Sequence, residues 1–350
     1  MITVNKEGIL LTKTNLDFEN EGVLNPAVMR EGDSVHLFYR AVQQGNHSTI
    51  GYCRLDGPLT VAERYDKPIL IPEFDFESQG VEDARIVKID NEYYMTYTAY
   101  DGINAQGALA VSTDMKKFEK HGIIVPPFSY VEFVYLLETA ERVNSKYYRN
   151  HKFYYQQKDI KIEKKTLMWD KDLIFFPRRI NGKLYFLHRI RPGIQLAAIN
   201  DIKELTKEFW KNYCMTLKNH ILMDPCLNKF ESKYIGGGCP PVETEHGWLL
   251  IYHGVEETDT GLIYSACAAL LKLDDPSVVL ARLPYPLFSP ENEWEQKGDV
   301  SNVVFPTGTA LFGDTLYIYY GAADVQIACA SLNLSELLKE LLLNKTQNEK

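Results

Sequence analysis

Five segments of the chain repeat one pattern, in which a polar or glycine-containing turn precedes a strand of alternating, mostly aromatic apolar positions. In most copies a loop and a second strand of small residues follow. This pattern predicts at least one antiparallel pair of strands in each copy. The copies are DSVHLFYRA from Asp33, NEYYMTYTA from Asn91, GKLYFLHRI from Gly182, GWLLIYHGV from Gly247 and DTLYIYYGA from Asp314.

The spacing of the copies is loose, so loops must absorb the excess length between them. Small sheets that bury one face poorly alone can stack radially, and five copies then suggest five blades. The sequence therefore predicts an all-β fold, a five-bladed β-propeller that forms a single domain over residues 1–350. A β-sandwich or a pair of all-β domains is the alternative, because aromatic alternation is common to all of them.

Two segments depart from the strand pattern. Residues 331–343 have helical apolar spacing with Asn333 as a capping residue, which predicts a C-terminal helix near 333–343. The long interval between the second and third copies holds an inserted segment near 128–168, basic and aromatic from Lys146 to Lys165. We expect this insertion to be a lid or a contact element.

Composition narrows the class of protein. The 350 residues are 45% hydrophobic and 24% charged, with a net charge of −9, which is typical of a globular protein and unfavourable for binding nucleic acid. No apolar run is long enough to span a membrane, and no secretory signal is visible at the start of the chain. We expect a cytoplasmic protein, or a periplasmic one if a signal peptide has been removed. The six cysteines lie far apart, so we expect reduced thiols and no metal site.

The ends of the repeated strands are the first candidates for a site. A propeller gathers equivalent strand ends around its axis, so polar residues there would converge on one pocket. Donors with aromatic walls suit a hydroxyl-rich ligand or an anion. These residues are Arg40, His188, Arg189, His253 and Tyr320.

Carboxylates are the second group of candidates. Glu82 and Asp83 are adjacent and precede Arg85, and in an extended segment only one of the two can enter the pocket. A salt-bridged loop with Arg85 is the structural alternative. Glu243 and Asp324 follow glycine- or proline-rich loops. Because no serine elbow, phosphate loop or zinc motif occurs, carboxylate chemistry such as glycosidic bond cleavage remains.

From about Asn25 to Leu338 the sequence resembles glycoside hydrolase family 130. The resemblance implies a five-bladed propeller that acts on mannosides, with Asp83 as general acid, although Ala84 stands where the family has proline. It also implies mannose contacts by Asn25, Arg40 and Asp324, and proton delivery through a sugar hydroxyl. The motifs that carry it are Asn-Pro at 25, Gly-Val-Glu-Asp-x-Arg, Tyr-Met-Thr-Tyr-Thr-Ala-Tyr-Asp, Phe-Phe-Pro-Arg-Arg-Ile-Asn-Gly-Lys with a following His-Arg, Pro-Pro-Val-Glu-Thr-Glu-x-Gly-Trp, and Tyr-Tyr-Gly-Ala-Ala-Asp.

The positions that correspond to the family's phosphate ligands carry two carboxylates. These positions are Lys171, Asp172, Arg189 and Glu243. An acid beside a phosphate dianion is unfavourable in a partly buried pocket, whereas it could deprotonate water. We therefore predict an inverting β-mannoside hydrolase with Asp83 as acid and Glu243 as base.

Two other functions stay open. One is a β-mannosyl-oligosaccharide phosphorylase that forms mannose 1-phosphate, with inorganic phosphate as co-substrate held by Lys171 and Arg189. The other is a non-catalytic sugar-binding propeller. In every case the expected partner is a mannose-containing oligosaccharide, with Glu82, His188 and His253 among the residues that bind it, and no cofactor or metal is expected. The sequence leaves the linkage and the formation of a homo-oligomer open.

Overall fold

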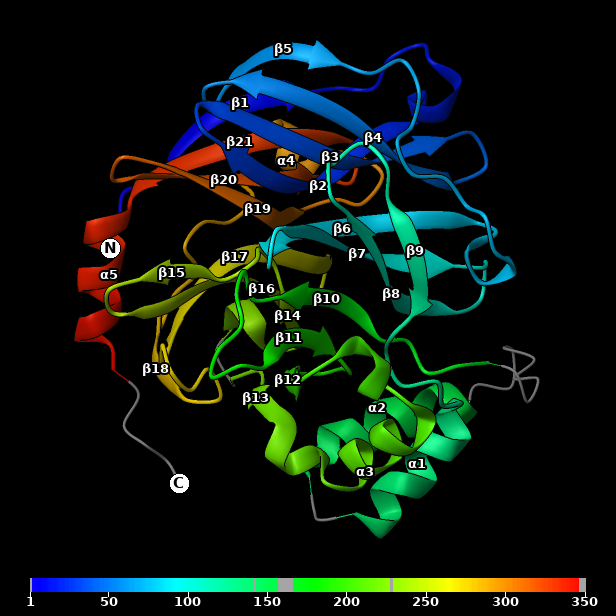
Figure 1. Ribbon diagram of the computed structural model, residues 1–350. Coiled ribbons are helices and arrows are strands. Elements are labelled where there is room, and N and C mark those ends of the chain that lie inside the picture. The colour runs from blue at the N-terminus through cyan, green and yellow to red at the C-terminus, as the bar shows by residue number, and fades with distance from the viewer. Residues whose placement is uncertain (1, 141–142, 157–165, 227–228, 346–350) are drawn as a thin grey trace.

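The chain is mostly β, as the sequence predicts, in a computed structural model that describes residues 2–140, 143–156, 166–226 and 229–345 (Figure 1). Nearly all strand pairs are antiparallel and join neighbours in the sequence. Each group of strands begins with a strand that packs against the first strand of a neighbouring group, as β2 (Gly22–Glu31), β6 (Gly80–Ile89) and β10 (Lys171–Phe175) do.

The N-terminal half of the chain forms one eight-stranded sheet. It consists of two antiparallel groups of four strands, because only a single parallel bridge between Ser48 and Gly80 joins them. The first group holds β2 (Gly22–Glu31), β3 (Ser34–Gln43), β4 (His47–Asp56) and β5 (Thr60–Arg64). The second holds β6 (Gly80–Ile89), β7 (Glu92–Tyr100), β8 (Ala105–Ser112) and β9 (Glu119–Ile123).

Three further sheets follow along the chain. The first contains β10 (Lys171–Phe175), β11 (Leu184–Arg189), β12 (Ile194–Ile199) and β13 (Ile221–Met223). The second contains β14 (Tyr234–Gly237), β15 (Val242–Thr244), β16 (Gly247–Thr258), β17 (Gly261–Leu271) and β18 (Val279–Arg282). The third contains β19 (Val304–Phe312), β20 (Thr315–Ala322), β21 (Gln326–Asn333) and the N-terminal β1 (Asn5–Leu11).

The two ends of the chain meet in this last sheet. β1 pairs antiparallel with β21, from Asn5 opposite Ser331 to Leu11 opposite Ile327. The last sheet is therefore completed by the first strand of the chain, which holds both termini in the fold by backbone hydrogen bonds.

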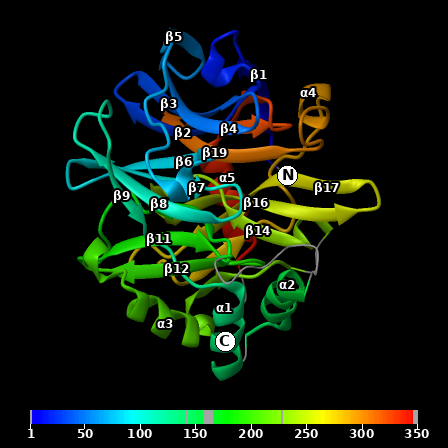
Figure 2. The same ribbon diagram turned by 90° about the vertical axis from the view of Figure 1, so that its right-hand side faces the viewer.

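Helices are few, but they are more numerous than the sequence pattern indicates. Helices α1 (Tyr130–Thr139), α2 (Ser145–Gln156) and α3 (Lys207–Met215) gather at one end of the molecule beside β12 (Figures 1 and 2). A short α4 (Glu293–Gln296) precedes β19, and α5 (Leu334–Leu343) ends the fold where helical spacing predicts it. The side chain of Asn333 caps α5 by accepting a hydrogen bond from the Glu336 N–H at 2.9 Å.

The inserted segment near 128–168 contains α1 and α2, whereas its residues 157–165 lie outside the described part of the chain. α1 begins with a capping box, in which Ser129 and Glu132 bond to each other's backbone N–H groups. Apolar residues of α1, such as Phe133, belong to a buried cluster shared with β10 and β11. The insertion is thus packed onto the sheet that begins with β10.

Buried apolar clusters lie between neighbouring sheets, so the small and aromatic residues of the repeats form the core. All six cysteines are free thiols, and all except the half-buried Cys226 are buried. Within the described ranges, no helix is long and apolar enough to cross a membrane.

Candidate active site

The first strands of three groups of strands, β2, β6 and β10, share one irregularity, and it positions the candidate site residues. The pairing register shifts next to Asn25 in β2, Asp83 in β6 and Asp172 in β10. These residues have φ angles of 49°, 49° and 54°. Asparagine and aspartate tolerate this left-handed conformation better than other non-glycine residues, and a bulge of this kind re-aims side chains. The three equivalent bulges therefore turn three polar side chains toward the space between the sheets.

Asn25 and Asp83 meet directly. The Nδ2 group of Asn25 donates a hydrogen bond to Oδ1 of Asp83 at 2.8 Å. Arg40, from β3, forms ion pairs with two carboxylates. Its Nη1 lies 3.7 Å from Asp83 Oδ1, and its Nη2 lies 2.8 Å from Glu82 Oε1. Lys171 Nζ lies 3.8 Å from the other oxygen of Glu82. Residues from β2, β3, β6 and β10 thus form one charged cluster.

The expectation that only one of Glu82 and Asp83 enters the pocket is wrong. Both carboxylates contact Arg40, because the bulge between Glu82 and Arg85 interrupts the alternation of side chains along β6. The alternative of a salt bridge to Arg85 does not hold either. The buried Arg85 donates to the carbonyl oxygens of Asp83, Ala84 and Gly238, and so fixes the backbone of the bulge.

The two aspartates near Arg40 differ in proton affinity. Burial alone would raise the pKa of Asp83, but the charges of Arg40 and Lys171 hold it below its usual range. Burial and the neighbouring Asp83 carboxylate instead raise the pKa of Asp324 to about 6. Asp324 sits in the turn before β21 with a φ of 54°, and it shares a groove of about 590 Å³ with Arg40. Asp324 is therefore half-protonated near pH 6, where the neighbouring Asp83 is still ionised.

Asp172 lies in a second buried cluster beside the first. Its Oδ2 is 3.1 Å from Arg189 Nε, and His253 Nε2 lies 3.2 Å from Arg189 Nη1. Burial lowers the pKa of His253 to about 3, so the ring is neutral and can accept from the guanidinium. Gly236 is required here, since a Cβ at that position would overlap with Asp172 and His253. The neutral His253 ring therefore helps to hold the Arg189 guanidinium in place through this hydrogen bond.

Cationic side chains converge on one small pocket next to Glu82. Lys171, Arg189 and Arg191 line it, together with Trp169 and residues of the insertion. The ring of Tyr234 lies under both guanidinium groups, with Arg189 Cζ at 5.3 Å and Arg191 Cζ at 4.1 Å from its centroid. The pocket itself has a volume of only about 20 Å³, so it is a cluster of three cations at the inner end of a wider groove that Asn150, Arg191 and Tyr234 also line. Such a cluster can attract a compact anion. We call this the cationic pocket.

His188 and Tyr320 are not site residues, contrary to the prediction. His188 is fully buried, with Nδ1 bonded to Asp170 and Nε2 to Tyr213, each at 2.8 Å. Tyr320 is buried and donates to Glu295 at 2.8 Å. Strand-end position alone does not separate residues that face the pocket from residues that face the core of a sheet.

Glu243 lies far from this cluster, which removes it as the base. It pairs with Trp248 in β15, whereas Gly236 pairs with His253 at the site end of β16. Five residues of β16 separate the two positions, or about 16 Å of strand. Glu243 is 44% exposed and accepts two hydrogen bonds from Arg178, at 2.8 and 2.7 Å. These bonds lower the pKa of Glu243, so it is a surface ion pair.

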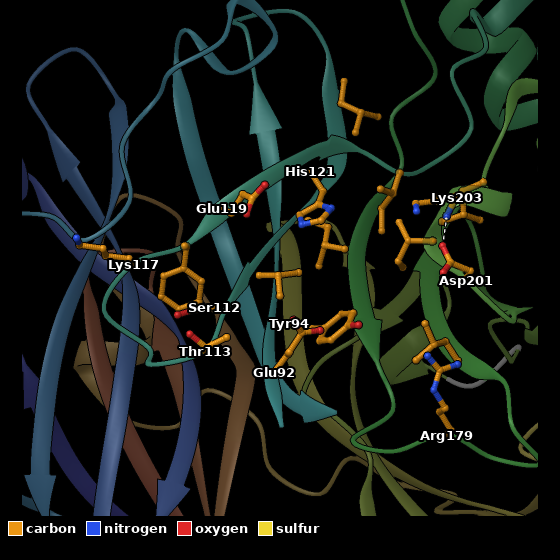
Figure 3. Close-up of a pocket in the computed structure, with 18 residues that line it drawn as sticks. Glu92, Tyr94, Ser112, Thr113, Lys117, Glu119, His121, Arg179, Asp201 and Lys203 are labelled. Carbon is orange, nitrogen blue, oxygen red and sulfur yellow. Dashed lines mark hydrogen bonds between the residues drawn. The ribbon is translucent and has the colours of Figure 1, made fainter. Parts of the chain in front are cut away.

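A wide groove lies on the side of the molecule, between β7–β9 and the turn after β12 (Figure 3). Its volume is about 850 Å³. Tyr94, Glu119 and His121 lie on one wall and Arg179, Asp201 and Lys203 on the other, as Figure 3 shows. None of the predicted site residues lines it. Size alone therefore does not locate the site.

Comparison with known families decides what kind of protein has this arrangement. A sequence profile of glycoside hydrolase family 130, described as beta-1,4-mannooligosaccharide phosphorylase, matches residues 10–342. The chain belongs to glycoside hydrolase family 130. It is thus an enzyme of a family whose members act on mannosides, and the resemblance carried by the sequence motifs is confirmed.

Individual relatives in family 130 cover nearly the whole chain. A 1,2-beta-oligomannan phosphorylase of Thermoanaerobacter sp. (strain X514) is 33% identical over 94% of this chain and 96% of its own. A beta-1,2-mannobiose phosphorylase of the same organism is 35% identical over 90% and 91%. The structure of a beta-1,2-mannobiose phosphorylase from Listeria innocua, in complex with beta-1,2-mannobiose, superposes with a TM-score of 0.73. It is 23% identical and covers 98% of this chain and all of its own, so it shows the same fold.

Sequence reasoning missed three residues of this family 130 site. Arg191 follows a strand end by two residues, Arg85 enters the prediction only as a salt-bridge partner in the structural alternative, and Tyr234 occupies an aromatic position typical of any core. A cluster of arginines around one pocket could have been suspected from the His-Arg-Ile-Arg-Pro segment. The role of Tyr234 under two guanidinium groups could not, because it depends on contacts between separate sheets.

Proposed function

We propose that the protein is a β-mannoside phosphorylase that cleaves β-mannosides with inorganic phosphate. The observation that carries this proposal is the cationic pocket next to Glu82, in which Lys171, Arg189 and Arg191 gather and from which the charge of Lys171 acts on Asp83. The whole-length relatives named as phosphorylases support the same function. Their names also favour β-1,2 linkages as the substrate class. Phosphate is then a co-substrate, and the proposal requires no further cofactor.

In this mechanism the phosphate occupies the cationic pocket and Asp83 is the general acid. A phosphate oxygen forms a bond to C1 of the terminal mannose while the bond from C1 to the glycosidic oxygen breaks. The proton of Asp83 passes to the departing oxygen, through a sugar hydroxyl as the family resemblance implies. Because attack comes from the opposite face, a β-mannoside gives α-mannose 1-phosphate.

The charges around Asp83 couple proton donation to phosphate binding. The charges of Arg40 and Lys171 hold the pKa of Asp83 low. A phosphate dianion beside Lys171 offsets one of these charges and raises the affinity of Asp83 for its proton. The acid thus becomes competent when the nucleophile is bound. Asn25, Arg40, Glu82 and Asp324 are left to hold the sugar.

We also propose that the five groups of strands are blades of a single propeller domain. The first strands contact one another in a circle, from β19 to β2, β6, β10 and β14, and the β14 sheet contacts β19 through β16 and β17. The pairing of β1 with β21 closes the last blade. This arrangement explains why bulges in separate sheets meet at one site.

Hydrolysis remains a second candidate, because of Asp172. Its carboxylate lies at the edge of the cationic pocket and pairs with Arg189 at 3.1 Å, where it weakens the attraction for phosphate and could activate water. Product analysis separates the two functions. With β-1,2-mannobiose, a phosphorylase releases mannose 1-phosphate only when phosphate is added. A hydrolase releases two mannoses without it, and a sugar-binding protein gives neither product.

A further inference from the structure

A second groove continues the cationic pocket toward the surface, along helix α2. Its volume is about 550 Å³. Its basic lining residues are Lys146, Arg149, Arg191 and Lys233, and among the residues that the structure describes Glu257 is the one acidic residue that lines it. Asn150 and Arg191 line both this groove and the cationic pocket. Glu257 pairs with Lys233, and the remaining cations, Lys146, Arg149 and Arg191, give the groove a positive balance on a protein whose net charge is −9.

Helix α2, which forms one wall of the groove, is anchored by hydrogen bonds of Tyr147. The hydroxyl of Tyr147 donates to Asp224 Oδ1 at 3.0 Å and accepts from Gln195 Nε2 at 2.9 Å. Gly193 leaves room for this hydroxyl, since a Cβ there would overlap with it. The loop of Gly193 also carries Arg191. The basic residues of α2 are thus held at a fixed place relative to Arg191.

The basic side chains form a series from the surface inward. Arg149 is exposed, Arg191 is half-buried, and Arg189 is 6% exposed. Arg191 and Arg189 share the ring of Tyr234 as a support. Lys146 bonds to the carbonyl of Ser232 across the groove at 3.3 Å. An anion that moves inward meets a positive charge at each step.

The groove on the other side of Arg40 has the opposite character. Its acidic lining residues are Glu21, Asp299 and Asp324, and Arg40 is the one cation that lines it within the described part of the chain. Such a surface repels a phosphate dianion, but its carboxylates and amides can accept and donate hydrogen bonds to a neutral sugar. The two grooves therefore suit two different ligands.

We propose that the groove along α2 is the path by which phosphate dianions reach the site and sugar 1-phosphates leave it. The inference rests on the proposed function, because it assumes that phosphate is the nucleophile. Charges along the groove raise the local concentration of the anion without contacting the reacting atoms. On this proposal, the helical insertion separates the path of the anion from the path of the oligosaccharide.

Reversal of one charge tests the path. In Arg149→Glu, we expect kcat/KM for phosphate to fall by about three- to tenfold at low ionic strength, with kcat and KM for the mannoside unchanged within about twofold. The loss of kcat/KM for phosphate should become much smaller at about 0.5 M NaCl, where the Debye length falls to about 4 Å. The matched control is Lys183→Glu, the same charge change in the exposed turn at the far end of β11 from Arg189.

Two results would overturn the path. One is an unchanged kcat/KM for phosphate in Arg149→Glu at low ionic strength, and the other is an equal loss in Lys183→Glu. Calorimetric titration with inorganic phosphate separates this inference from the proposed function. If the wild-type protein forms no sugar phosphate, yet binds phosphate and does so more weakly in Arg149→Glu at low salt, the groove is a path for phosphate, whereas phosphorolysis and the exit of sugar 1-phosphates are both contradicted. If it binds no phosphate, the path falls as well.

Discussion

Asn25 and Asp83 occupy equivalent bulges in neighbouring sheets, and the amide of one donates to the carboxylate of the other at 2.8 Å. Gly321 of β20 lies against this pair, because a Cβ there would overlap with Oδ1 of Asn25. Three sheets thus position one hydrogen bond to the candidate acid. This bond is one of the interactions that lower the pKa of Asp83.

Gly321→Ala should displace the Asn25 amide and weaken that bond. We expect kcat/KM for the mannoside to fall about ten- to a hundredfold, since small displacements of a positioned group are costly. The pKa of Asp83 rises when the bond is lost, so the pH at which kcat declines should move upward. A pH–rate profile checks both effects. An unchanged profile in a variant with a wild-type melting temperature would contradict this role of the Asn25–Asp83 bond.

Asp83→Asn and Glu243→Gln make the same chemical change at two carboxylates. Asparagine accepts the positive φ of position 83, so the fold should persist, and we expect kcat to fall at least about a hundredfold. Glu243→Gln removes only an exposed ion pair with Arg178, so its activity should be within about twofold of wild type and its stability within about 1 kcal/mol. Loss of activity in Glu243→Gln would restore it as a catalytic candidate.

The raised pKa of Asp324 predicts how stability depends on pH. Its pKa is about 6 in the fold against 3.8 ordinarily, so the folded state binds this proton more tightly than the unfolded state. The stabilisation of the folded state by this proton is fully present below about pH 3.8 and is lost as pH rises through about 6. Asp324→Asn should therefore match wild type near pH 4 and exceed it near pH 8, by at most about 3 kcal/mol because water screens the partly exposed carboxyl. Urea unfolding at both pH values measures this difference. An equal change at both would show that the carboxyl titrates normally.

The sequence predicts a mainly β chain and the family, because repeated aromatic strands and continuous motifs are local features. It also points to Asp83, Arg40, Asn25 and Asp324, which the fold brings together around Arg40. The prediction that only one of Glu82 and Asp83 enters the pocket is wrong because it assumes that side chains alternate along β6. At Glu82 and Asp83 the bulge breaks the alternation.

The error at Glu243 has a different cause. Motif similarity places the loop of Glu243 at the site. In the structure, β14 and β15 instead pair with opposite ends of β16. Gly236, at the start of the same stretch, does reach Asp172 and His253. Seven residues of nearly extended chain thus carry the loop from one end of the sheet to the other. Helices α1 to α3 were missed as helices because short segments of mixed polarity give no clear period.

The most direct test of phosphorolysis follows the oxygen that arrives at C1 of the released mannose. The reaction is run with β-1,2-mannobiose and ¹⁸O-labelled inorganic phosphate in ordinary water, and the products are analysed by mass spectrometry and ³¹P NMR. We predict α-mannose 1-phosphate that carries the label in its bridging oxygen, with mannose as the other product in equal amount. Two equivalents of mannose without sugar phosphate, at a rate that does not depend on phosphate, would contradict the account and establish hydrolysis.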